Sequence, residues 1–234
     1  GGGGASTAIQ NAVSYGTTVG RGGLGCPNFF ASGNDNGGVS YPAAYPEAIA
    51  VGASSPCDER KSPSSCDGET WWGSNFGSTL DFVAPGPLTT TVDIAGSGGY
   101  SSGDYTTSFN GTSSATPHAA GAGALLLAVS PGLTDSEVRT LMRQTADDQV
   151  GPPSEDTPGF DIYMGYGRVN CEALLLAVAS LVPGPTNLTC NNSGAATTLA
   201  WSNGAAYSSM EVSRNGALLA TLAGSATTST DGST

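Results

Sequence analysis

The chain is organised around residues Gly111–Leu127, which read GTSSATPHAAGAGALLL. The run that starts at Ser113 carries almost no charge and is small or apolar on every side, which predicts a helix wrapped by protein. Because Ser113 lies at the expected helix start, unpaired N–H groups of the first turn would point toward whatever its hydroxyl attacks. The stretch therefore predicts a serine nucleophile on a buried helix, with Pro117 tolerated near the helix start. The alternative is a buried helix on which the serine is only a cap.

Composition excludes two classes of function. The chain has 234 residues and a net charge of -12, with only seven Lys plus Arg. Such a chain would repel a phosphate backbone, so no nucleic-acid partner is expected. No apolar stretch reaches the roughly 18 residues of a membrane span, and none is predicted.

The order of expected elements indicates an α/β fold. Helical spacing after the capping candidate Ser6 predicts a first helix that ends near Gly16. Residues 29–31, 48–53 and 80–86 read as buried strands, and Thr134 with Glu137 forms a capping box at the start of a later helix. Helices that alternate with buried strands predict a mainly parallel sheet flanked by helices.

A composition change near residue 182 predicts two domains, residues 1–182 and 183–234. Beyond Pro183-Gly184-Pro185, strand-like runs at 197–201, 209–214 and 218–222 replace the alternation, and Asn215-Gly216 is typical of a type I′ hairpin. This segment resembles the first part of a fibronectin type III-like β-sandwich. Such a sandwich needs about 100 residues, so a partial, truncated β-sandwich is expected.

Residues 111–121 match the pattern Gly-Thr-Ser-x-Ala-Thr-Pro-His-x-Ala-Gly. This pattern resembles the nucleophile motif of the subtilisin-like serine proteases, the subtilases, and the resemblance extends in order from residue 1 to about 180. It implies a subtilisin-like fold and a secreted, extracellular serine endopeptidase that cleaves extended polypeptides. The sequence does not indicate which oligomeric state the protein adopts.

The resemblance also implies site residues. Ala31-Ser32-Gly33-Asn34 matches the family's Ala-x-Gly-Asn segment, so Asn34 would donate a hydrogen bond to the oxyanion together with the backbone N–H of Ser113. We therefore expect Ser113 and Asn34 to be catalytic. The expected substrate-binding residues are Gly1, Gly2, Ala31, Ser32, Gly33 and Thr112, with the first two on an edge strand that pairs with the substrate. Pro42, in a family-like Tyr-Pro segment, is a candidate for a cis peptide bond.

The sequence departs from the family where the other catalytic residues should be. Subtilases carry Asp, His and Ser in that order, and the first two lie before the position that corresponds to Gly1. The only histidine here is His118, which on a helix lies roughly 140° around from Ser113, so a structural role is expected. The chain is interpreted as a fragment, truncated upstream of Gly1 and downstream of Thr234, and nearly inactive alone.

Two other functions remain open. The first is a non-catalytic binding or adhesion module with a subtilase fold, and the sequence encoded upstream of Gly1 would discriminate it. The second is an esterase of the α/β-hydrolase kind, which fits less well because its nucleophile lies in G-x-S-x-G and its histidine follows the serine.

Cysteines and acidic loops are the features of the sequence from which a disulfide or a metal site could be predicted. Cys57 and Cys66 bracket a polar loop and predict a disulfide, although two free thiols remain the alternative. Calcium stabilises many subtilases, but Asp35, Asp93 and Asp104 form no D-x-D-x-D-G pattern. No cofactor and no metal site is therefore predicted.

Overall fold

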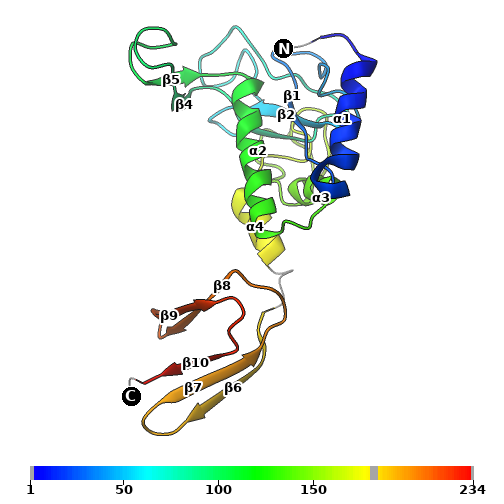
Figure 1. The fold of residues 1–234 in the computed structure, drawn as a ribbon. Helices are drawn as coiled ribbons and strands as arrows, with labels where there is room; N and C mark the ends of the chain where they lie inside the picture. Colours follow the sequence, from blue (N-terminus) through cyan, green and yellow to red (C-terminus); the bar gives the residue numbers. More distant parts are fainter. Residues whose placement is uncertain (1–2, 180–183, 233–234) are drawn as a thin grey trace. The chain divides into compact units, whose positions relative to one another are not determined.

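The computed structural model describes residues 3–179 and 184–232. The chain divides into two compact units, Gly1–Val178 and Ala179–Thr234. The first unit contains the helices and a parallel sheet, whereas the second is built from antiparallel strands, as Figure 1 shows. In the part of the chain that is described, no helix is both long and apolar enough to cross a bilayer.

A three-stranded parallel sheet forms the centre of the first unit. Its strands are β1 (Phe29–Ala31), β2 (Ile49–Ser54) and β3 (Phe82–Pro85), in the order β1-β2-β3. Every residue of β2 is buried, as expected for the middle strand of a parallel sheet covered on both faces. The predicted strands and the predicted parallel sheet are thus confirmed, although β1 is half-buried and not buried as predicted.

Helix α2 (Thr112–Val129) packs along this sheet and contains the predicted nucleophile (Figure 1). A Cβ atom on Gly123 would lie only 2.8 Å from Cζ of Phe29, so the small residues of the helix permit close contact with β1. The prediction that protein wraps the helix on every side is wrong for this structure. Leu125 is 52% exposed and Val129 47% exposed, because only the face toward the sheet is covered.

Two details of the predicted helices also change. Pro117 is the sixth residue of α2 and not part of its first turn, so it removes one interior hydrogen bond of the helix. Helix α1 (Thr7–Val19) continues three residues beyond Gly16, and the side chain of Ser6 makes no capping bond. Instead the hydroxyl of Tyr45 bonds the backbone N–H and C=O of Ser6, at 2.6 and 2.8 Å.

Helix α3 (Asp135–Gln144) is fixed to the sheet by a buried carboxylate. The predicted capping box between Thr134 and Glu137 is present at its start. From the body of the helix, Arg139 Nε and Arg143 Nε donate to Oδ1 of Asp81 at 2.7 and 2.6 Å. The other oxygen of Asp81, whose side chain is fully buried, accepts the backbone N–H of Ala50 at 2.8 Å. One carboxylate therefore connects α3 to β2.

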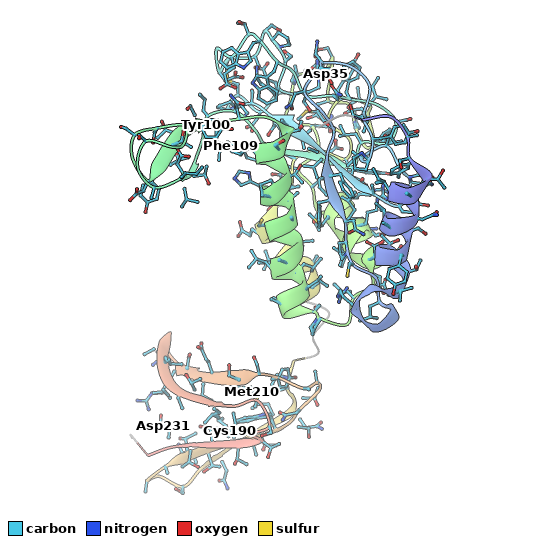
Figure 2. All side chains as sticks on the ribbon, turned by 45° about the horizontal axis from the view of Figure 1, so that its top comes forward. Asp35, Tyr100, Phe109, Cys190, Met210 and Asp231 are labelled. Carbon is cyan, nitrogen blue, oxygen red and sulfur yellow. A yellow bond between two sulfur atoms is a disulfide. The ribbon has the colours of Figure 1, made fainter. Side chains whose placement is uncertain are left out.

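The first unit also contains a short 3-10 helix, η1 (Gly20–Gly23), a hairpin and all but the last residue of helix α4 (Cys171–Ala179). The hairpin consists of β4 (Thr89–Val92) and β5 (Tyr105–Phe109), which pair in antiparallel fashion. The sequence did not indicate it. Figure 2 shows Tyr100 and Phe109 close together on this hairpin, and their ring centroids lie 5.9 Å apart in an edge-to-face arrangement.

The second unit contains two small antiparallel sheets. Strands β6 (Thr186–Asn192), β7 (Thr197–Ser202) and β10 (Thr228–Asp231) are arranged in the order β10-β7-β6, and β8 (Ser209–Arg214) pairs with β9 (Ala217–Ala223). Asn215 and Gly216 have φ values of 54° and 81°, which confirms the predicted turn with two positive φ angles. Trp201 on β7 is 9% exposed.

The connection through Asp81 predicts a large loss of stability when its charge is removed. We expect Asp81→Asn to lower the free energy of unfolding by about 3 kcal/mol, because two guanidinium groups lose their buried partner. Urea unfolding followed by circular dichroism measures this. Asp104→Asn, at an exposed residue of the hairpin, is the control and should change stability by less than about 0.5 kcal/mol. Equal stabilities of the two variants would contradict the prediction.

Candidate active site

The turn that begins α2 places Ser113 at the surface. Gly111 is the N-cap residue with φ of 99°, a left-handed conformation that favours glycine. A Cβ atom there would also lie 3.1 Å from Nδ2 of Asn34. Thr112 is buried while Ser113 is exposed, so the hydroxyl of Ser113 is accessible to a substrate.

Asn34 follows β1 and is held against this turn by Thr112. Its Oδ1 accepts the backbone N–H of Thr112 at 2.9 Å and the hydroxyl of Thr112 at 2.8 Å. The same hydroxyl accepts the N–H of Gly33 at 3.3 Å. Because two donors fix the amide oxygen, the amide nitrogen of the exposed Asn34 remains as a hydrogen-bond donor.

The first-turn amides of α2 complete the arrangement. The N–H groups of Ser114 and Ala115 donate to the carbonyl of Gly111, at 3.0 and 3.3 Å. Among the residues that the structure describes, no protein acceptor lies against the N–H of Ser113. That amide and the side-chain amide of Asn34 are the two donors that the sequence predicted for an oxyanion.

Of the other predicted site residues, Ala31 ends β1, and Ser32 and Gly33 follow it. Ser32 is fully buried and donates its hydroxyl to the carbonyl of Asn75 at 3.1 Å, whereas Ala31 and Gly33 are half-buried. The Tyr41–Pro42 peptide bond is cis, as predicted. Gly3 pairs with Tyr41 in an antiparallel bridge. Gly1 and Gly2, the predicted edge-strand residues, lie outside the described residues.

His118 lies away from the hydroxyl of Ser113. Its Nδ1 is 2.9 Å from the carbonyl oxygen of Ser114, one helical turn earlier, and its ring is exposed. The interaction is local to α2 and agrees with the predicted structural role. Within this chain, His118 is therefore not placed to take a proton from Ser113.

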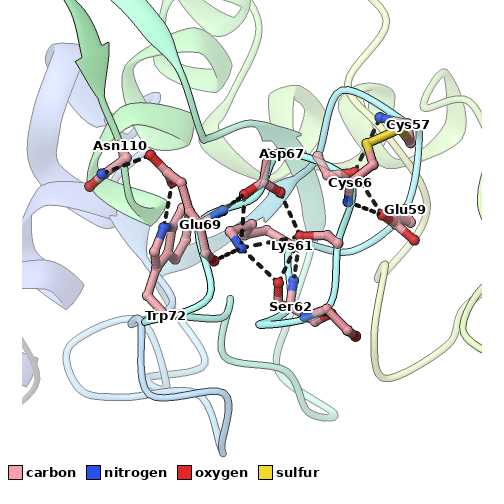
Figure 3. Close-up of polar contacts among 12 residues, drawn as sticks. Cys57, Glu59, Lys61, Ser62, Cys66, Asp67, Glu69, Trp72 and Asn110 are labelled. Carbon is pink, nitrogen blue, oxygen red and sulfur yellow. Dashed lines mark hydrogen bonds and ion pairs between the residues drawn. A yellow bond between two sulfur atoms is a disulfide. The ribbon is translucent and has the colours of Figure 1, made fainter.

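A buried polar network beside the turn was not indicated by the sequence (Figure 3). The ammonium group of Lys61, which is fully buried, lies 3.1 Å from Asp67. Two residues further on, the carboxylate of Glu69 accepts Nε1 of Trp72 at 2.6 Å and Nδ2 of Asn110 at 3.1 Å. Asn110 directly precedes the Gly111 turn, so the network reaches the candidate site.

The loop between Cys57 and Cys66 contains both the disulfide and the side chains of ligand type that come together. Cys57 and Cys66 form the predicted disulfide, and Cys26, Cys171 and Cys190 are free. Within the described residues, one group of ligand-type side chains comes together, Cys57, Glu59 and Cys66. The sulfur atoms of Cys57 and Cys66 are bonded to each other, so neither cysteine can act as a thiolate ligand. Asp35, Asp93 and Asp104 form no such group in the described chain.

A serine hydroxyl exposed at a helix N-terminus beside a side-chain amide is an arrangement by which serine hydrolases attack a carbonyl. The family model described as "Subtilase family" matches residues 1–167. The chain belongs to the subtilase family.

Individual relatives agree with this assignment. The chain is similar to a calcium-dependent protease of Nostoc sp., with 34% identity over 76% of this chain and 28% of that protein. It is also similar to a subtilisin of Bacillus pumilus, with 34% identity over 71% of this chain and 50% of that protein. A solved structure titled as proteases from Pseudoalteromonas arctica shares the fold with a TM-score of 0.57 and 24% identity, covering 76% of this chain and 48% of that one. The chain thus spans half or less of these relatives.

The polar network around Lys61 leads us to expect that the stability of the fold at acid pH depends on Asp67. Burial alone would raise the pKa of Asp67, but hydrogen bonds from Ser65 and from the N–H of Glu69, together with the Lys61 ammonium, lower it below its ordinary value of 3.8. The stabilisation is therefore present above about pH 4 and is lost as the pH falls through the lowered pKa. We expect the urea-unfolding free energy to fall less steeply below pH 4 in Asp67→Asn. Parallel curves for the two proteins would contradict this expectation.

Proposed function

We propose that this chain carries the nucleophile and the oxyanion donors of a subtilisin-type serine endopeptidase. The observation that supports this most directly is the hydrogen bonding of Asn34 to Thr112, which orients a donor amide beside the exposed Ser113. In the proposed reaction, the hydroxyl oxygen of Ser113 attacks a peptide carbonyl. The N–H of Ser113 and Nδ2 of Asn34 stabilise the resulting oxyanion.

The reaction also needs a base, which takes the proton of the hydroxyl and returns it to the leaving amine. The only histidine in the chain is turned toward Ser114. We therefore propose that the acid and base come from residues outside these 234, and that this chain alone has very low activity. An oxyanion hole by itself leaves residual catalysis of roughly 10³–10⁴ over water.

We further propose the setting of the activity. The substrate is an extended polypeptide, as for proteases of this family. The disulfide between Cys57 and Cys66 supports an extracellular location, because such bonds persist in oxidising surroundings. We assign residues 1–182 to the catalytic domain and 183–234 to part of a fibronectin type III-like domain, which the antiparallel sheets of the second unit support.

The first test is covalent labelling of the protein at the full length that its gene encodes. We expect a serine-directed fluorophosphonate to label Ser113 and the Ser113→Ala variant to remain unlabelled. Peptide mapping by mass spectrometry identifies the modified residue. If the folded protein is not labelled, the endopeptidase proposal fails, and absence of Asp and His motifs from the upstream sequence would favour the binding or adhesion module.

The second test separates the two roles of Asn34. The Asn34→Asp variant keeps an oxygen that accepts hydrogen bonds from Thr112 but loses the donor. We expect kcat to fall by about 10²–10³ with little change in KM, a magnitude carried over from the corresponding asparagine of a subtilisin and not calculated for this chain. Steady-state kinetics on a peptide substrate measures this. A variant with unchanged kcat would exclude Asn34 as an oxyanion donor.

A further inference from the structure

Lys61 is the centre of a hydrogen-bonded loop next to the candidate site. Its ammonium group donates to the carbonyls of Ser62 and Glu69 at 2.7 and 2.6 Å and to Oγ of Ser65 at 3.1 Å. It also pairs with Asp67 and lies 5.0 Å from the ring centroid of Trp72. A buried charge is tolerated only where such contacts compensate for the lost water. Figure 3 shows these polar contacts around the ammonium group of Lys61, which connect the two ends of the loop.

The direction of the Glu69 side chain follows from this loop. Its backbone N–H donates to Oδ1 of Asp67 at 2.9 Å, while its carbonyl accepts from Lys61. Because the N–H and the carbonyl of Glu69 are both hydrogen-bonded, the backbone position from which its buried side chain extends is fixed. One oxygen accepts the indole N–H of Trp72, and the other accepts the amide of Asn110.

Both contacts of Glu69 lead to the turn before Ser113. Asn110 directly precedes Gly111 in the chain. Trp72 lies near the same turn, since a Cβ atom built on Gly86 would be 3.4 Å from Cη2 of Trp72 and 3.2 Å from the carbonyl oxygen of Gly111. That carbonyl accepts the first hydrogen bonds of α2. The position of this turn therefore determines where the hydroxyl and N–H of Ser113 lie.

We propose that Glu69 is a positioning residue of the active site, which holds Asn110 and thereby the Ser113 turn in a catalytically competent geometry. This inference rests on the proposed endopeptidase function. A displacement of about 1 Å of reacting groups can reduce a rate by about 10². A carboxylate that aligns the turn therefore affects turnover without contacting the substrate.

The contact between Glu69 and Asn110 can be broken and then restored. In Glu69→Gln, the amide oxygen can still accept from Trp72, and Asn110 regains a hydrogen bond to the new NH₂ group by turning its own amide so that Oδ1 accepts, so this variant is expected to cost little. In Asn110→Asp, two carboxylates face each other. In the double variant Glu69→Gln/Asn110→Asp, the glutamine can donate to the new carboxylate and still accept from Trp72, so the match of donor and acceptor returns.

The experiment uses the full-length protein and compares kcat, KM and the rate of fluorophosphonate labelling, each per folded molecule. We expect kcat and the labelling rate to fall about tenfold or more in Asn110→Asp, with KM within about twofold, to change by less than about threefold in Glu69→Gln, and to return to within about threefold of the original in the double variant. Glu59→Gln is the matched control. Glu59 bonds Ser55 and the N–H of Cys66 in the same loop, and its variant should keep kcat.

The outcomes distinguish this inference from the function on which it rests. If the unmodified protein is labelled at Ser113 but Asn110→Asp keeps kcat and loses only stability, the positioning role is overturned. Failure of the double variant to recover kcat also overturns it. If the unmodified protein is not labelled, the endopeptidase proposal fails, and amide hydrogen exchange of Ser114 and Ala115 decides the positioning role. Exchange should be faster in Asn110→Asp and restored in the double variant, whereas unchanged exchange in Asn110→Asp overturns the role.

Discussion

The close approach of α2 to the parallel sheet is the constraint on which the first unit depends. At Gly123 a side chain would collide with Phe29, and at Gly111 it would press on Asn34. The helix can therefore lie close to β1 only because these positions carry no Cβ atom. The carboxyl end of β1 and the N-terminus of α2 then meet at one edge of the sheet, where parallel α/β folds place their sites. Asn34 and Thr112 are hydrogen-bonded there although 78 residues separate them.

Charged side chains in this protein serve mainly as internal connections. Only 11% of the residues are charged, yet each of the seven cations has a partner within the described structure. Arg139 and Arg143 meet at Asp81, and Arg168 connects Asp58 with Asp147. The net charge of -12 follows from the excess of 19 Asp plus Glu over seven Lys plus Arg.

Local patterns allowed much of the fold to be predicted. The three strands of the sheet, the capping box at Thr134 and the Asn215-Gly216 turn depend on neighbouring residues, and each is present, although β1 is only half-buried. The hairpin β4–β5 was missed because its strands are short and rich in threonine and serine. The prediction that protein covers α2 on every side was wrong. The composition of the helix shows that it can be buried, but it does not show which of its faces other elements cover.

The candidate site was only partly accessible to sequence reasoning. Ser113 and Asn34 came from motifs, and the structure brings their segments together. The contacts of Glu69 were not foreseen, because its hydrogen bond to Asn110 joins residues 41 positions apart and depends on the conformation of the Lys61 loop. Such a pairing produces no periodic pattern and no motif in the sequence. Only the three-dimensional path of the loop reveals it.

The burial of Lys61 has a practical consequence for chemical probing. It is the only lysine in the sequence, and its ammonium group is fully enclosed. An amine-directed reagent therefore finds no accessible lysine side chain while the loop is closed, and acylation of Lys61 requires the loop to open. Acylation of Lys61, identified by peptide mass mapping, would thus report local unfolding of the loop near the candidate site.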